Sequence, residues 1–181
     1  VADEFTDRFV DAFERLTVGD PMDEETDVGP QADPDLMAEL HEQVEASVEA
    51  GATVLTGGDP LDGEGAFYPP TVLTDVPEGC PADAEETFGP VSAIIPVKDA
   101  EEAIAVANDS DLGLGGAVWS NDKERAIEVA RRVETGNMFV NGMTKSDPRL
   151  PFGGVKKSGY GRELSVFGIR EFVNIKTIWV A

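Results

Sequence analysis

The sequence predicts an α/β fold with a mostly parallel sheet and flanking helices. The chain has 181 residues, of which 41% are hydrophobic, and this length suits one compact domain with a buried core. From residue 91 onward, short β-branched segments alternate with amphipathic segments of helical length, which is typical of βαβ units. The single cysteine, Cys80, excludes an internal disulfide and a four-cysteine zinc site.

The first part of the chain is predicted to contain two helices and two strands. Phenylalanines recur every four residues between acidic side chains, which predicts an amphipathic helix over residues 2–17. A second helix is expected from about residue 34 until Gly51 ends it. Short strands are predicted over residues 52–56 and 67–73, and the proline pair of the latter confines it to an edge or a bulge.

The second part alternates more regularly. Predicted strands cover residues 91–97, 116–119, 138–140 and 173–180, and predicted helices cover residues 99–108 and 121–135. Asp99 is expected to cap the first of these helices and Gly136 to end the second. Residues 142–162 are rich in Gly, Pro and Lys and are predicted to form a long loop, which in a compact domain is usually functional.

The charge balance excludes two classes of partner. The chain has 14 Lys and Arg residues and 36 Asp and Glu residues, so its net charge is −22. Such a surface repels nucleic acids and anionic membranes, and no apolar run is long enough to span a bilayer. The acidic residues are spread along the chain, which disfavours an acidic tail, and no D-x-[DN]-x-[DN]-G calcium loop is present. We therefore favour a surface adapted to high salt, as in a halophilic organism. We expect no metal site.

Few side chains suggest chemistry by their type alone. His41 lies among glutamates and is interpreted as a solvated histidine, and the acidic surroundings of Cys80 disfavour a nucleophilic thiolate. Glu85 and Glu86 precede an aromatic turn and form either a solvated corner or a site for a sugar diol. The glycines of residues 153–161 fit either a close backbone approach to a ligand or an ordinary mobile loop.

Two longer motifs carry a family resemblance. Residues 85–91 (EETFGPV) and residues 151–163 (PFGGVKKSGYGRE) resemble signatures of the NAD(P)-dependent aldehyde dehydrogenase superfamily. Residues 29–31, 67–73 and 138–141 follow the order and spacing of that family. Residues 141–150 resemble the succinate-semialdehyde dehydrogenase branch in particular.

The resemblance implies an aldehyde-dehydrogenase-like catalytic domain fragment. Residues 1–171 would be the C-terminal part of the catalytic domain and residues 172–181 an oligomerisation strand, with the nucleophilic cysteine and the general-base glutamate in preceding sequence. The implied enzyme oxidises an aldehyde, here succinate semialdehyde, to the acid with NAD or NADP through a cysteine thiohemiacetal and thioester. It would be a cytoplasmic homo-oligomer, a dimer or tetramer, and this chain alone is expected to be inactive.

The resemblance also implies roles for individual residues. Glu86 would hold the nicotinamide ribose hydroxyls, and Phe88 would pack beside the nicotinamide. Phe152 would line the aldehyde pocket, and Ser146 would contact the substrate carboxylate. Glu163 matches a glutamate that relays protons near the general base.

A different class of function stays open. The chain would then be a catalytically silent assembly or interaction module that oligomerises through residues 172–181. An upstream reading frame that encodes a G-Q-x-C stretch would favour the enzyme, and a frame that begins at Val1 would favour the module.

Overall fold

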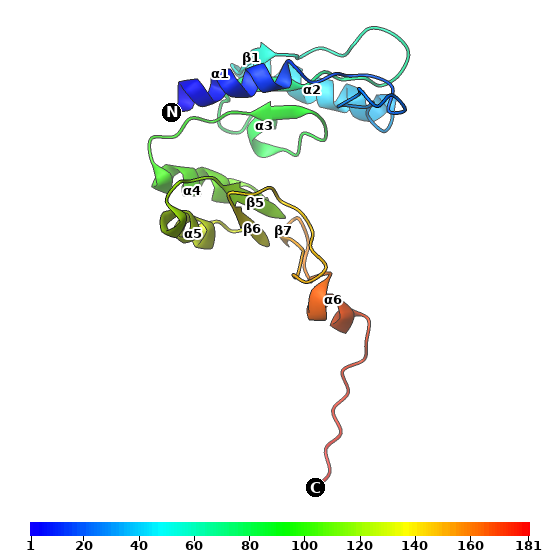
Figure 1. The fold of residues 1–181 in the computed structure, drawn as a ribbon, viewed down its shortest axis with the longest axis vertical. Coiled ribbons are helices and arrows are strands. Elements are labelled where there is room, and N and C mark those ends of the chain that lie inside the picture. The colour runs from blue at the N-terminus through cyan, green and yellow to red at the C-terminus, as the bar shows by residue number, and fades with distance from the viewer. The chain divides into compact units, whose positions relative to one another are not determined.

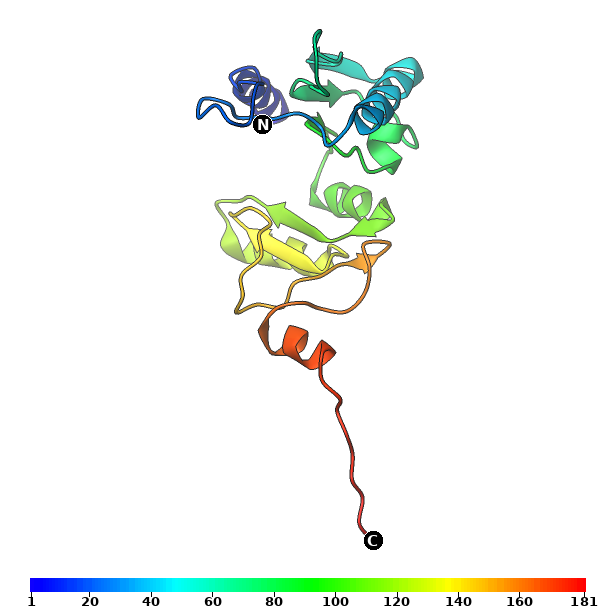
Figure 2. The same ribbon diagram turned by 90° about the vertical axis from the view of Figure 1, so that its right-hand side faces the viewer.

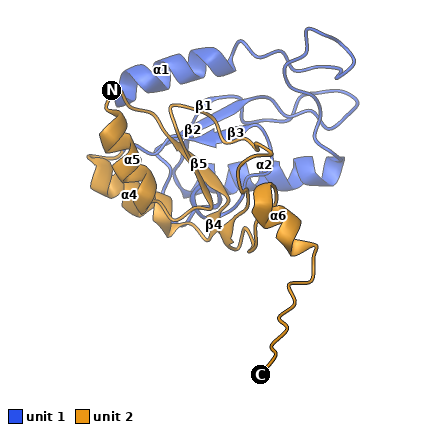
Figure 3. Ribbon diagram, turned by 60° about the horizontal axis from the view of Figure 1, so that its bottom comes forward, with its two compact units in different colours: residues 1–96 blue, residues 97–181 orange.

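The computed structural model describes residues 1–181, which divide into two compact units, residues 1–96 and residues 97–181 (Figure 3). The first unit contains α1 (Ala2–Phe13), α2 (Pro34–Ala50), β1 (Thr53–Thr56), β2 (Thr71–Thr74), α3 (Pro81–Ala84) and β3 (Val91–Ala93) (Figure 1). The second contains α4 (Ala100–Asp109), β4 (Leu112–Gly113), β5 (Gly115–Val118), α5 (Lys123–Arg132), β6 (Asn137–Val140), β7 (Val155–Lys156) and α6 (Ser165–Glu171). No helix is both long and apolar enough to cross a membrane.

Helix α2 supplies much of the core of the first unit. Its N-cap, Asp33, accepts a hydrogen bond from the Leu36 amide at 2.9 Å, and Gly51 ends it with a positive φ of 126°. Its apolar face forms the core with residues that follow β1 and lie in β2, a set that consists of Leu40, Val44, Tyr68 and Leu73. The predicted helix that ends at Gly51 is therefore confirmed.

The sheet of the first unit has three strands. Strand β2 lies in the middle, antiparallel to β1 and parallel to β3. In Figures 2 and 3 this sheet lies between α1 and α2. Because β2 pairs on both sides and is covered by helices, the side chains of Thr71, Val72 and Leu73 are fully buried.

The second unit is built on the parallel pair β5–β6, with Gly115 opposite Asn137 and Val118 opposite Val140. Helix α5 packs against both strands, and α4 contacts α5. Asp99 caps α4 through the Glu102 amide, as predicted, and Asp122 caps α5 through the Arg125 amide. A short antiparallel pair, β4–β7, completes this unit.

Several predicted elements have different bounds. The predicted strand over residues 67–73 begins only at Thr71, because two prolines without an N–H precede it. The helix predicted over residues 121–135 ends at Arg132, so Val133, and not Gly136, is its C-cap. Two of the four strand pairs are parallel and two are antiparallel, so the pairing is mixed.

The predicted strand over residues 173–180 is absent from the structure of the single chain. These residues follow α6 without regular secondary structure (Figure 1). A strand needs a neighbour for its backbone hydrogen bonds, and no other strand pairs with this segment. Its apolar side chains are exposed, with Trp179 at 87% of its full accessibility.

Candidate functional site

The turn of residues 85–90 in the first unit is held by a side chain of α2. The Gln43 amide donates from Nε2 to Glu85 Oε2 at 2.9 Å and to the backbone oxygen of Glu86 at 3.3 Å. The Glu85 carboxylate is thus engaged within the protein, whereas the exposed Glu86 carboxylate accepts no hydrogen bond from it. Phe88, two residues further, leaves 67% of its surface exposed.

This turn fits a ligand that carries hydroxyl groups and a flat ring. A carboxylate with both oxygens unoccupied accepts two hydrogen bonds from a ribose diol, and each such bond is charge-assisted. An exposed aromatic ring offers a face on which a heteroaromatic ring packs. The acceptor oxygens of Glu86 and the exposed ring of Phe88 therefore suit a ligand of this kind.

The second unit holds the other motif in a tightly anchored loop. The backbones of Phe152 and Glu163 exchange two hydrogen bonds, of 3.0 and 2.8 Å, which close the loop between them. The Asn137 side chain donates from Nδ2 to the backbone oxygens of Leu114 and Gly153, both at 2.9 Å. The loop is therefore fixed to the first residue of β6.

Gly136 explains how the loop approaches this strand so closely. A Cβ at this position would overlap the carbonyl oxygen of Gly153 and lie 2.8 Å from its carbonyl carbon and 3.1 Å from Gly154 Cα. Only a residue without a side chain leaves room for that backbone. Gly136 is needed for this close approach rather than for the end of α5.

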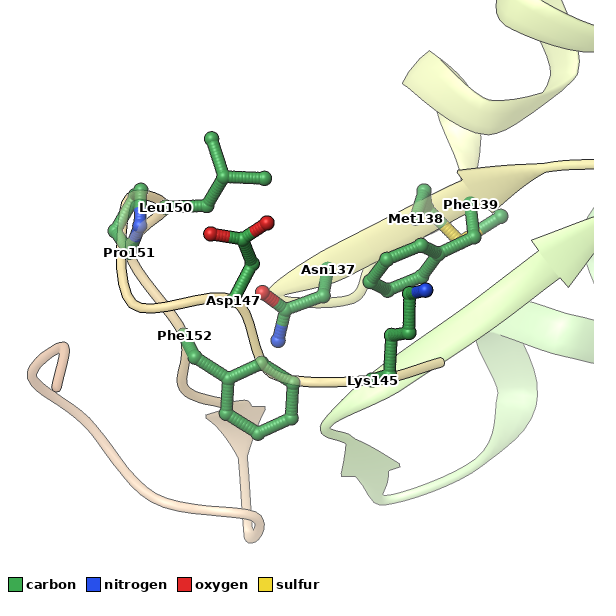
Figure 4. Close-up of a pocket in the computed structure, with 8 residues that line it drawn as sticks. All are labelled: Asn137, Met138, Phe139, Lys145, Asp147, Leu150, Pro151 and Phe152. Carbon is green, nitrogen blue, oxygen red and sulfur yellow. The ribbon is translucent and has the colours of Figure 1, made fainter. Parts of the chain in front are cut away.

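A pocket of about 120 Å³ opens beside the loop (Figure 4). In Figure 4, Asp147, Leu150 and Pro151 lie on one side of it and Met138, Phe139 and Lys145 on the other, with Asn137 and Phe152 between them. The volume is small compared with about 300–1,000 Å³ for pockets that bind drug-sized ligands. It suits a ligand of a few carbon atoms.

The charges around this pocket are distributed unequally. Arg149 donates to Asp147 from Nη2 at 2.6 Å and from Nε and its backbone amide at 2.9 Å each. These hydrogen bonds hold the pKa of the Asp147 carboxyl well below its usual range, and the nearby Lys145 charge adds to the shift. Asp147 and Arg149 neutralise each other, whereas no carboxylate pairs with the Lys145 ammonium.

The structure places the predicted site residues as follows. Phe152 lines the pocket, and the backbone bridge brings Glu163 beside it, although the Glu163 side chain is exposed. Ser146 is exposed and is absent from the pocket lining, whereas both of its neighbours in the chain, Lys145 and Asp147, line it. Glu86 and Phe88 lie together in the turn of the first unit.

Sequence reasoning missed Lys145, Asp147 and Asn137 as pocket residues. The sequence contains two signals that point to Lys145 and Asp147. In an extended segment residues i and i+2 face one side, so Lys145 and Asp147 alternate with Ser146. The spacing of Asp147 and Arg149 also allows an ion pair between them, which leaves the Arg149 guanidinium engaged.

The two other candidate groups, His41 and Cys80, both lie in the first unit. His41 Nδ1 lies 3.3 Å from the buried Tyr68 hydroxyl, so the histidine is partly packed rather than fully solvated. Cys80 is buried, with only 5% of its surface exposed. No group of three or more His, Cys, Asp or Glu side chains is arranged to hold a metal ion.

Comparison with known proteins gives the family. A family model described as "Aldehyde dehydrogenase family" matches residues 1–178. The chain belongs to the aldehyde dehydrogenase family. A "probable succinate-semialdehyde dehydrogenase" of Synechocystis, named with NADP(+), is 52% identical over all 181 residues, which are 40% of its own length. A succinate semialdehyde dehydrogenase of Escherichia coli, named with NAD(P)+, is 51% identical over 99% of this chain and 39% of its own.

Solved structures agree with the fold of this aldehyde dehydrogenase chain. A succinic semialdehyde dehydrogenase from Streptococcus pyogenes in complex with NADP+ superposes with a TM-score of 0.92 and 42% identity, over 98% of this chain and 40% of that one. The expected aldehyde-dehydrogenase-like α/β fold is confirmed. The chain spans about 40% of the length of the relatives that it matches.

Proposed function

We propose that this chain is part of an oxidoreductase that oxidises succinate semialdehyde to the carboxylic acid with NAD or NADP. The observation that carries the proposal is identity of about 50% to two succinate-semialdehyde dehydrogenases over essentially the whole chain. The small pocket beside Phe152 supports a substrate of this size.

Glu86 and Phe88 are the proposed cofactor residues. When bound, the nicotinamide cofactor accepts the hydride that aldehyde oxidation releases. The free Glu86 carboxylate would hold the ribose hydroxyls and the exposed Phe88 ring would pack beside the nicotinamide, while Glu85 is occupied by Gln43.

Phe152, Ser146 and Glu163 are the proposed residues on the substrate side. Phe152 provides an apolar wall, and a water-poor wall strengthens the electrostatic interactions of the reacting groups. Glu163 would pass protons to or from the general base, and Ser146 would contact the substrate carboxylate.

The reactive groups belong, in this proposal, to other sequence. We propose that the chain is the C-terminal segment of a longer enzyme, with the nucleophilic cysteine and the general-base glutamate in the preceding part. Cys80 is a poor candidate for the nucleophile because its thiol is buried. The isolated chain is therefore predicted to have no dehydrogenase turnover.

The surroundings of the enzyme are also proposals. The exposed apolar residues of the segment 172–181 support a strand that pairs with another subunit of a homo-oligomer. One cysteine in 181 residues supports a reducing compartment such as the cytoplasm, and the net charge of −22 supports a salt-adapted source.

The two neighbouring glutamates offer a matched test of the cofactor role. In the longer enzyme, Glu86→Gln should raise the KM for the cofactor about 10-fold, because charge-assisted hydrogen bonds become neutral ones. Glu85→Gln should change that KM less than about 2-fold, since its carboxylate is already held by Gln43. Equal effects of the two substitutions would remove Glu86 from the cofactor site.

A further inference from the structure

Gln43 is the only residue of α2 that donates hydrogen bonds to the turn of residues 85–90. Its side-chain amide offers one proton to Glu85 Oε2, at 2.9 Å, and the other to the carbonyl oxygen of Glu86, at 3.3 Å. The backbone amides of residues 86–88 donate no hydrogen bond within the protein. Gln43 is therefore the only group outside the turn that holds the Glu86 backbone.

The two ends of this region are held on α2 by other contacts. At one end, the Ala82 amide donates to the Ser47 hydroxyl at 2.9 Å. At the other end, Gly89 lies so close to α2 that a Cβ there would overlap Leu40 Cδ2. Leu40 and Ser47 lie three and four positions from Gln43, so the three residues share one face of the helix. Loss of the Gln43 amide should therefore loosen the middle of the turn and leave its ends in place.

The same contact determines which of the two neighbouring glutamates faces away from α2. Glu85 has an extended backbone, with a φ of −111° and a ψ of 163°. In an extended backbone successive side chains point to opposite sides. A Glu85 carboxylate that is fixed on α2 therefore directs the Glu86 carboxylate away from this helix, where a ligand can reach it.

We propose that Gln43 is a positioning residue, which holds the Glu86 carboxylate ready for the two hydroxyl groups of a cofactor ribose. This inference rests on the proposed function and adds a residue that acts through the turn rather than on the ribose. A loosened turn presents Glu86 correctly only part of the time, and the apparent affinity for the cofactor falls by that fraction. A bound cofactor orders the turn again, so the reaction step itself changes little.

The test measures the KM for the cofactor, the KM for succinate semialdehyde and kcat in the longer enzyme. Gln43→Leu keeps the approximate size of the side chain but removes its donor, and it should raise the cofactor KM about 5-fold. The aldehyde KM and kcat should change less than about 2-fold. Gln43→Lys keeps a donor for the Glu85 carboxylate and should restore most of the cofactor KM. A general loss of structure would instead change all three constants, and Gln43→Lys would not restore them.

Two substitutions of Glu85 test the same contact from its other side. Glu85→Gln keeps an acceptor oxygen for the Gln43 amide, whereas Glu85→Leu removes it. Only Glu85→Leu should therefore raise the cofactor KM, by about 3-fold, because the contact with the Glu86 carbonyl oxygen remains. In the double variant, Glu85→Leu should add no further increase to that of Gln43→Leu, since both remove the same hydrogen bond.

The control is Glu42→Leu, at the exposed preceding position of α2, which should not raise the cofactor KM. If Glu86→Gln raises this KM and Gln43→Leu does not, the proposed function stands and the positioning role is overturned. Equal increases in the KM for cofactor and aldehyde in Gln43→Leu would overturn it as well. If Glu86→Gln leaves the cofactor KM unchanged, the proposed cofactor site itself fails, and the positioning role fails with it.

Discussion

Replacement of Gly136 by alanine tests the close approach of the loop of residues 152–163 to β6. The new Cβ would overlap the Gly153 carbonyl, and no side-chain rotation relieves a contact with backbone. Overpacking costs about 1–3 kcal/mol, and we take about 3 kcal/mol because the neighbour is rigid. Alanine also lowers the conformational entropy of the unfolded chain, which stabilises the folded protein by about 0.4–1 kcal/mol. Gly136→Ala should therefore lower the unfolding free energy by about 2 kcal/mol.

Gly142→Ala is the matched control. The new Cβ would meet no atom within 4 Å, and the φ of Gly142 is not positive. Only the stabilisation from the lower entropy of the unfolded chain therefore remains. Urea unfolding of the two variants should differ by about 2.5–3 kcal/mol, with equal m-values. If Gly136→Ala unfolds within about 0.5 kcal/mol of Gly142→Ala, the loop does not approach β6 as described.

Three further predictions concern a buried hydroxyl, a carboxyl and the surface charge. Ser47→Ala should lower the unfolding free energy in urea by about 1–3 kcal/mol. The fully buried Ser47 hydroxyl accepts a hydrogen bond from the Ala82 amide and donates one to the Gln43 carbonyl. A decrease of less than about 0.5 kcal/mol would contradict this. The lowered pKa of Asp147 predicts that its contribution to stability is present above pH 4 and lost as the pH falls through the folded-state pKa. A carboxyl carbon NMR titration should find Asp147 ionised at pH 3 in wild type but not in Arg149→Ala, and a wild-type midpoint near 3.9 would refute the pair. The net charge of −22 predicts that the melting temperature rises between 0.1 and 2 M KCl, and a fall would count against a salt-adapted surface.

The longer elements of the fold were predictable because their signals are local. The apolar face of α2 repeats every three or four residues, and Asp99 and Gly51 are recognisable caps. Helices α3 and α6 were not predicted, since four and seven residues are too few to display a period. Helix α6 also begins at Ser165, and both this residue and the N-cap Leu164 have a positive φ that L side chains rarely adopt.

The site was predictable only in part, because its geometry depends on contacts between residues that lie far apart in the sequence. The family resemblance of the two motifs pointed to Phe152 and Glu86, and the roles of these residues stay predictions. The engagement of Glu85 by Gln43 joins residues 42 positions apart, and no local pattern reports it. The same holds for Gly136, whose role depends on the backbone of a loop that follows β6.

The central claim is that this chain supplies binding groups to an aldehyde dehydrogenase while the nucleophile lies in other sequence. The most direct measurement is kcat for succinate semialdehyde in the longer enzyme with Cys80→Ser, since Cys80 is the only cysteine of this chain. We predict a kcat within about 2-fold of wild type, because the Cys80 thiol is buried. A loss of about 1,000-fold or more in correctly folded protein would identify Cys80 as the nucleophile and contradict the account.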